Sequence, residues 1–145
     1  MRAVSARNQL RGKVSAIIEG SVNNEVIITL DNGDEIVTVI TKQSCETLGI
    51  VPGKVVISVI KAPWVVLAQA DGNLRFSARN QFLGRVEKCV KGAVNSTVHF
   101  VTEKGLGLTA VITNESFDEM EIKEGVKVIG LIKASSIIVA TEKED

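Results

Sequence analysis

The pentapeptide Ser-Ala-Arg-Asn-Gln occurs twice in this chain, at residues 5–9 and again at residues 77–81. Other polar residues recur at the same 72-residue offset, and each brings a hydroxyl, an amide or a cation. The recurring pairs are Ser5/Ser77, Arg7/Arg79, Asn8/Asn80, Asn23/Asn95, Thr41/Thr113, Ser44/Ser116 and Lys61/Lys133. Carboxylates do not recur in this set, and Glu25, for example, is matched by Thr97. An oxyanion has only acceptor oxygens, so a group of donors without acids is suited to binding a tetrahedral dianion.

Each recurring residue also has a purely structural explanation. The repeated glycines fit turns, and the asparagines of Gly-x-Val-Asn can stabilise a turn with their side chains. The paired threonines fit helix N-caps, and the paired arginines can form ion pairs on the surface. Lys61 and Lys133 are harder to explain in this way, because each interrupts a strongly apolar stretch at one fixed place. The residues alone therefore leave both interpretations open.

The sequence offers no set of residues for covalent or metal chemistry. The single histidine, His99, is matched by Ile27 in the other copy, and no cluster has the spacing of metal ligands. There is no Gly-x-x-x-x-Gly-Lys-Ser/Thr loop and no Ser/His/Asp set that both copies share. Cys45 and Cys89 occupy unrelated positions in the two copies, which favours reduced thiols over a disulfide. We expect a protein that is not an enzyme and has no metal cation bound directly.

The repeat divides the chain into two small domains. It aligns without a gap, and we predict a first domain at residues 1–68, a linker at 69–76 and a second domain at 77–145. A domain of about 70 residues buries a modest fraction of its surface and is marginally stable alone. Association between copies, or between chains, is therefore expected.

Within each copy the pattern is that of short strands around one small helix. In the first copy we predict strands at residues 13–18, 25–30, 35–40 and 55–60, with a final apolar strand after Lys61. Thr41 and Gly49 are suited to cap a helix over residues 42–48. The predicted fold class is all-β, with two tandem OB-like small β-barrels that each carry one short helix.

Composition argues against several partners. Seventeen Lys and Arg balance seventeen Asp and Glu, and aromatic residues make up only 3% of the chain. A nucleic-acid-binding barrel needs a basic face and stacking aromatics, so we expect no nucleic-acid partner. The apolar runs are far shorter than the ~20 residues of a spanning helix, and no apolar leader is evident at the start. We expect no membrane partner and a cytoplasmic location.

The repeated motifs resemble those of a known family. The segments SARNQLRGKV, GSVNNEV, TVITKQS and KAPWVVLA, with SARNQFLGRV, GAVNSTV, AVITNES and KASSIIVA, are similar to the molybdenum-pterin-binding (Mop) domain. Two tandem copies cover about residues 4–140. The resemblance implies OB-like barrels, a homo-oligomer that is a trimer for tandem copies, and molybdate or tungstate as bound ligand.

The resemblance also implies the position of the oxyanion sites. One class sets the Ser-Ala-Arg-Asn segment of one domain against the Lys-Ala loop of another, with the Thr-x-x-Ser residues in reach of similar sites. The implied residues are Ser5, Ala6, Arg7, Asn8, Thr41, Ser44, Lys61 and Ala62 in the first copy, and Ser77, Ala78, Arg79, Asn80, Thr113, Ser116, Lys133, Ala134 and Ser135 in the second. A second class is expected near a three-fold axis, at Ser21, Val22 and Asn23 and at Ala93, Val94 and Asn95.

The two copies differ in one loop of the implied site. The first copy reads Lys61-Ala62-Pro63-Trp64 where the second reads Lys133-Ala134-Ser135-Ser136. Proline has no N–H, and neither Pro63 nor Trp64 brings a hydroxyl, so a site that uses the first loop has fewer donors. We expect Trp64 itself to be an interface or core anchor.

The function that follows from these expectations is intracellular storage and homeostasis of molybdate, by reversible binding without catalysis. The alternative is a molybdate-sensing or delivery module that acts on a partner protein. Sensors and transporter ATPases that carry such domains also need a helix-turn-helix or a phosphate-binding loop, and neither pattern is found here, which favours a free-standing protein.

Overall fold

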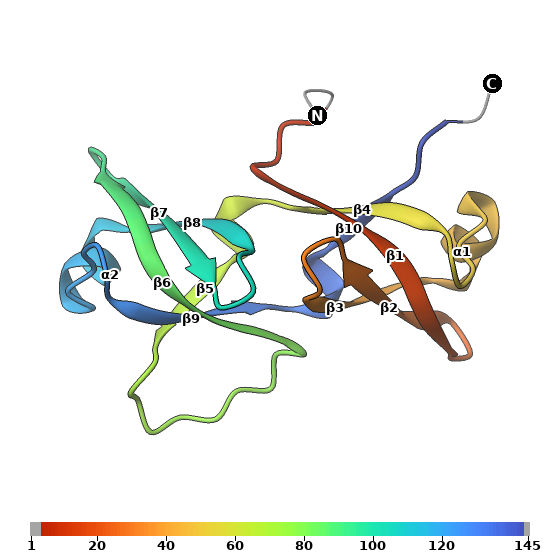
Figure 1. Ribbon diagram of the computed structural model, residues 1–145, viewed down its shortest axis with the longest axis horizontal. Coiled ribbons are helices and arrows are strands. Elements are labelled where there is room, and N and C mark those ends of the chain that lie inside the picture. The colour runs from red at the N-terminus through yellow and green to blue at the C-terminus, as the bar shows by residue number, and fades with distance from the viewer. Residues whose placement is uncertain (1–3, 144–145) are drawn as a thin grey trace. The chain divides into compact units, whose positions relative to one another are not determined.

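The computed structural model describes residues 4–143, and these residues form two compact units. Of the described residues, 4–60 and 133–143 form the first unit and 61–132 form the second. Each unit is built on one five-stranded antiparallel sheet (Figure 1). The expected all-β class with two tandem units and few short helices is confirmed.

Unit 1 has the strand order β10-β4-β1-β2-β3. Its elements are β1 (Asn8–Glu19), β2 (Asn23–Leu30), β3 (Glu35–Thr41), α1 (Lys42–Leu48), β4 (Val55–Ile60) and β10 (Ile138–Ala140). A short 3₁₀ helix at Ala134–Ser136 precedes β10 and packs on β3. The first strand begins five residues earlier than we predicted, so Asn8 lies inside the sheet.

Unit 2 repeats this plan with the strand order β5-β9-β6-β7-β8. Its elements are β5 (Val66–Gln69), β6 (Asn80–Lys91), β7 (Asn95–Thr102), β8 (Gly107–Thr113), α2 (Asn114–Glu119) and β9 (Lys127–Ile132). The 3₁₀ helix Ala62–Trp64 precedes β5 and packs on β8.

The last strand of each sequence copy belongs to the sheet of the other copy. β5 pairs with β9, with Val66 opposite Leu131, and β10 pairs with β4, with Ile138 opposite Val59. Figure 1 shows β10, near the blue end of the chain, beside β4 from the first copy. The compact units and the sequence repeats therefore differ in one segment of each copy, which the two copies exchange.

The first strand of each copy bends at a bulge so that it serves two neighbours. The early half of β1 pairs with β4 and the later half with β2, and the register shifts between Val14 and Ala16. Ser15, the extra residue, donates its hydroxyl to the carbonyl oxygen of Ile27 at 3.1 Å. β6 has the same shift between Val86 and Lys88. Such bulges curl a sheet.

Branched aliphatic side chains fill the interior of each unit, as the composition predicted. The largest fully buried side chains in unit 1 are Val14, Val26, Ile28, Ile36, Val56 and Ile60, and in unit 2 they are Val65, Val98, Phe100, Leu108, Val128 and Ile132. Phe100 stands where the first copy has Ile28, and Gly130 stands where the first copy has Ser58. The larger ring in unit 2 is thus accompanied by a position without a side chain.

Candidate functional site

One end of unit 1 gathers two of the polar segments singled out from the sequence. β1 and β10 flank β4 and both run antiparallel to it, with Asn8 opposite Ile60 and Ile138 opposite Val59. The segments that lead into β1 and β10 therefore emerge at the same end of β4. We call this the unit 1 end and define it as residues 5–8 with residues 133–136, one segment from each sequence copy.

The corresponding end of unit 2 is built from the opposite copies. Asn80 lies opposite Ile132, and Val66 lies opposite Leu131. The segments that lead into β6 and β5 therefore emerge together beyond the last residue of β9. The unit 2 end is defined as residues 77–80 with residues 61–64.

The repeated pentapeptide has one residue that anchors it in the sheet and two that lie on the surface. The Asn8 amide donates to the carbonyl oxygen of Ile60 at 3.2 Å, and the Asn80 amide donates to that of Ile132 at 3.1 Å. Both asparagines are buried, whereas the serine and the arginine of each copy are exposed. Asparagine thus ties the segment to the neighbouring strand, and the exposed donors are left at the end of the unit.

The glutamine that follows closes the same segment. Gln9 donates its amide to the carbonyl oxygens of Val4 and Ala6, at 3.2 and 2.9 Å. Gln81 makes the equivalent bonds to Phe76 and Ala78, both at 3.0 Å. No role was predicted for this glutamine, although its repetition in both copies is a signal that it has one.

The Lys-Ala loops have one backbone form and different surroundings. Lys133 and Ser135 are exposed at the unit 1 end, while Ala134 is buried. The Thr38 hydroxyl, buried in β3, contacts the carbonyl oxygens of Ala134 and Ile137 at 3.3 Å each. Thr38 was also missed from sequence, because its counterpart in the other copy is Ala110 and the pattern does not repeat.

In the unit 2 loop, Lys61, Pro63 and Trp64 are exposed and Ala62 is buried. The Lys61 ammonium lies 5.8 Å from the centroid of the Trp64 ring. Trp64 retains 42% of its accessible surface, so it is not a core residue of this chain. The part of the expectation that placed it in a core is therefore wrong, and the interface role stays a prediction.

The Thr-x-x-Ser residues are helix caps in both copies. Thr41 accepts the N–H of Ser44 at 3.1 Å, and Thr113 accepts that of Ser116 at the same distance. Gly49 ends α1 in the left-handed conformation, as predicted. Thr41 and Thr38 have opposite parity in β3 and so face opposite sides of the strand. The structure places these caps beside the loops before β2 and β7, since the N–H of Lys42 bonds to the carbonyl oxygen of Val22 at 2.9 Å.

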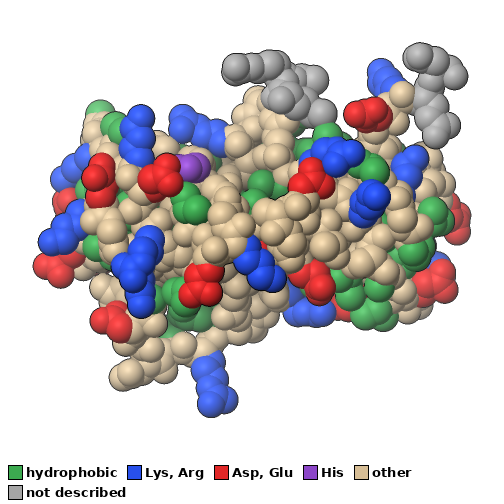
Figure 2. All heavy atoms as spheres, in the orientation of Figure 1, with side chains coloured by type: hydrophobic (Ala, Val, Ile, Leu, Met, Phe, Trp, Pro, Cys, Tyr) green, Lys and Arg blue, Asp and Glu red, His purple; other side chains and the backbone are tan. Residues whose placement is uncertain are grey.

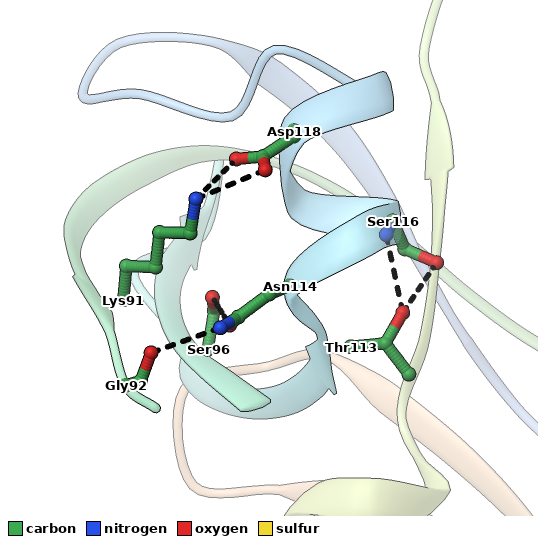
Figure 3. Close-up of polar contacts among 7 residues, drawn as sticks. All are labelled: Lys91, Gly92, Ser96, Thr113, Asn114, Ser116 and Asp118. Atoms are coloured by element: carbon green, nitrogen blue, oxygen red, sulfur yellow. Dashed lines mark hydrogen bonds and ion pairs between the residues drawn. The ribbon is translucent and has the colours of Figure 1, made fainter. Parts of the chain in front are cut away.

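The loops proposed for a second class of site are also held by side chains. In unit 2 the Asn114 amide donates to the carbonyl oxygen of Gly92 at 2.9 Å and its oxygen accepts the hydroxyl of buried Ser96 at 2.6 Å (Figure 3). Lys91, at the end of β6, forms an ion pair at 2.9 Å with Asp118 of α2, the helix that also contains Asn114. These contacts fix the loop Ala93-Val94-Asn95 against α2.

Unit 1 fixes its loop with different residues. Asn24 accepts the N–H of Gly20 at 3.3 Å, and it occupies the position of Ser96 in the other copy. Because the anchoring amide moves from one position to another between copies, a search for identical repeated residues could not find it. Val22 and Val94 at the tips of the two loops keep 68% and 74% of their surface exposed.

The histidine, the cysteines and the charged side chains show no arrangement for catalysis or metal binding among residues 4–143. The His99 Nδ1 lies 3.2 Å from the hydroxyl of Thr109 on the neighbouring strand. Both cysteines are free, and within residues 4–143 no three His, Cys, Asp or Glu side chains are grouped to hold a metal ion. Figure 2 shows acidic and basic side chains interspersed on the visible face. None of the helices formed by residues 4–143 has the length and apolar character needed to cross a membrane.

Comparison with known proteins gives this arrangement a family. The TOBE domain family matches residues 4–67 and again residues 77–139. The chain belongs to the TOBE domain family. A solved structure described as the cytoplasmic molybdate-binding protein ModG, with molybdate bound, superimposes with a TM-score of 0.91 at 40% identity and covers 97% of this chain and 99% of that one.

Curated TOBE relatives are longer than this chain. The molybdenum transport protein ModE of Herbaspirillum seropedicae is 35% identical over 140 residues, which are 97% of this chain and 52% of that protein. The molybdenum-pterin-binding protein MopA of Rhodobacter capsulatus is 38% identical over 136 residues, 94% of this chain and 51% of that protein. The chain therefore spans about half the length of these relatives.

Proposed function

We propose that this chain binds molybdate, or the equivalent tungstate, reversibly at the two ends defined above and serves as an intracellular store of the oxyanion, without catalysis. The observation that carries the proposal is the meeting, at one end of each unit, of a Ser-Ala-Arg-Asn segment with a Lys-Ala loop from the other copy. The two segments of each end contain hydroxyls, N–H groups and cations and no carboxylate. The similarity to the molybdate-bound ModG structure supports the same ligand.

The chemistry of binding rests on donors rather than on net charge. A tetrahedral dianion that leaves water needs a hydrogen bond for each of its oxygens, and exposed serine hydroxyls, backbone N–H groups and one lysine can supply them. Ser5, Arg7 and Lys133 have this role at the unit 1 end, and Ser77, Arg79 and Lys61 have it at the unit 2 end. The chain as a whole is neutral, so attraction at long range contributes little.

The proposal includes a homo-oligomer, a trimer as the Mop resemblance implies. Apolar residues are exposed at the same positions of both copies, namely Ile18 and Val90, Val22 and Val94, and Val66 and Ile138. Their repetition favours a shared packing role over chance exposure. The exposed loops Ser21–Asn23 and Ala93–Asn95 are the proposed second class of site within such an oligomer.

Native mass spectrometry of the whole protein tests the proposal. The expected result is a trimer that gains several molybdates and few or no sulfates at equal concentration. The double variant Ser5→Ala/Ser77→Ala should bind fewer molybdates, because one hydroxyl is lost at each end. Thr29→Val, which removes an exposed hydroxyl elsewhere on the sheet, is the matched control and should bind as the parent does. A monomer indifferent to both anions would contradict the proposal.

A sensing or delivery module is the second candidate, and the observation that favours it is the match to about half of ModE proteins, which include regulators by name. Hydrogen exchange with and without molybdate separates the two candidates. A store should show slowed exchange confined to the ends of the units and the proposed loops. A module that signals to a partner should also change exchange on surfaces that do not contact the anion.

A further inference from the structure

The Lys-Ala loops at the two ends share one backbone conformation. The lysine that begins each loop has φ −68° and ψ 137° at Lys61, and φ −65° and ψ 136° at Lys133. The N–H three residues on bonds to the lysine carbonyl oxygen in both, at 2.9 Å in one loop and 3.0 Å in the other. Differences between the ends therefore arise from the side chains and from the donors each loop carries.

The loops offer different donors at the same places. In the unit 1 loop, Ser135 is exposed and supplies an N–H and a hydroxyl, and Ser136 is half-buried and supplies a second hydroxyl. The unit 2 loop has Pro63 and Trp64 at these positions, so one N–H and two hydroxyls are missing. An acceptor oxygen that is stripped of water and left without a donor costs free energy, so this loop should bind an oxyanion less well.

The lysines of the two loops also meet different surroundings. The Lys61 ammonium lies over the face of the Trp64 ring, an attractive arrangement for a cation. An oxyanion at the unit 2 end must draw Lys61 from that position or share it. The unit 1 loop has Ser136 in place of the tryptophan, so Lys133 has no ring within its own loop.

The unit 1 loop is in addition held by a side chain of β3. The Thr38 hydroxyl contacts the carbonyl oxygens of Ala134 and Ile137, whereas Ala110 at the matching place in unit 2 has no hydroxyl. Fixed donors lose less freedom when a ligand binds, which favours the same end.

We propose that the two ends are unequal oxyanion sites, and that residues 63 and 64 against 135 and 136 determine the difference. The unit 1 end binds the tetrahedral dianion tightly, and the unit 2 end binds it more weakly by about tenfold or more, as expected for the loss of several donors. The two ends therefore fill in two steps, so that the anion at the unit 1 end is retained and the anion at the unit 2 end is readily released. This inference rests on the proposed function.

Trp64 provides a direct reading of the weaker end, because it is the only tryptophan of the chain. Molybdate is titrated into the whole 145-residue chain while heat release reports all sites and tryptophan emission reports the unit 2 end. The expected result is that the two ends titrate as separate classes, apart from any binding at the loops Ser21–Asn23 and Ala93–Asn95, with the emission change following the weaker end. A single class, or an emission change that follows the tighter class, would overturn the inference while leaving the proposed function standing.

Exchanging the loop residues provides the matched pair of variants. Pro63→Ser/Trp64→Ser gives the unit 2 end the donors of the other loop, and heat release should then show the weaker class shifted toward the tighter one. Ser135→Pro/Ser136→Trp should weaken the tighter class instead. Unchanged affinities in both variants, with circular dichroism like that of the parent, would reject the assignment to these residues. Absence of molybdate binding in the parent would reject the proposed function as well.

Discussion

At the scale of single residues, the two copies fill equivalent core positions with different pairs of side chains. A Cβ atom at position 130 would clash with Cζ of the Phe100 ring. The first copy has the smaller Ile28 in place of the phenylalanine and carries Ser58 in place of the glycine. In the second copy a side chain at position 130 would clash with the ring, and a smaller residue at position 100 would leave a gap.

This pairing predicts the effect of Gly130→Ser. The new side chain must displace the buried Phe100 ring, and overpacking of this kind lowers the free energy of unfolding by about 1–3 kcal/mol. Adding Phe100→Ile reproduces the residues of the first copy and should recover most of the loss. Urea unfolding of the two single variants and the double variant measures the coupling. Additive losses would show that the two positions are independent.

The Ser58 hydroxyl also shows what sequence cannot reveal at this scale. It is fully buried, and among the described residues it has no hydrogen-bond partner. Ser58 shares its face of β4 with the buried Val56 and Ile60. A serine within an apolar strand can lie on either face, and the sequence does not show that this one lies on the buried face. In contrast, the capping roles of Thr41 and Gly49 were predictable, because caps depend on residues close in sequence.

At the scale of elements, the helix ends distinguish the copies. α1 ends at Gly49 with φ 63°, a conformation that glycine adopts readily. The equivalent position after α2 is Glu121, which has φ 51° and is the only non-glycine residue with positive φ among residues 4–143. The chain beyond the second helix therefore passes through a non-glycine residue in a region that L-residues disfavour.

Replacing Glu121 with glycine should relieve this strain. We expect Glu121→Gly to raise the free energy of unfolding by about 0.5 kcal/mol, because the relief exceeds the extra entropy that glycine loses on folding. Gly49→Ala is the matched control and should lower it by about 1 kcal/mol. Thermal unfolding followed by circular dichroism measures both. Destabilisation by Glu121→Gly would show that the glutamate side chain contributes more than its backbone costs.

Strand positions were largely predictable, but the partner of the last strand was not. β5 and β10 come from equivalent segments, and Val66 and Ile138 at their starts are equally exposed, at 56% each. Either segment has the alternation to fit either sheet, so pattern alone gives no preference. The same ambiguity limited the prediction of the site. Which Lys-Ala loop lies beside each Ser-Ala-Arg-Asn segment depends on this exchange.

At the scale of the whole chain, the exchange means that neither sequence copy contains a complete sheet as the structure has it. Buried side chains hold the exchanged strands, with Leu67 of β5 keeping 8% and Val139 of β10 keeping 7% of their exposure. The covalent linker around Gly72 is exposed and forms no strand. Association of the copies should therefore survive when the linker is cut.

A specific protease site inserted at Gly72 tests this expectation. After cleavage, the two halves should elute together in size-exclusion chromatography under native conditions and separate in denaturant. The comparison protein carries Leu67→Asp and Val139→Asp in addition, and its halves should separate without denaturant, since a buried unpaired carboxylate is strongly unfavourable. If the halves of the protein that carries only the protease site separate under native conditions, strand exchange contributes little to their association.

The point of exchange also bears on how such a chain can grow or shrink in evolution. The break between units falls after Ile60 and again after Ile132, at equivalent places one repeat apart. Recombination between the two gene halves at these places removes or adds one whole repeat length in frame. Excision of residues 61–132 would leave β1 to β4 followed directly by β10, the five strands of a single sheet. Copy number in this architecture can therefore change by unequal crossing-over without creating a new joint in any strand.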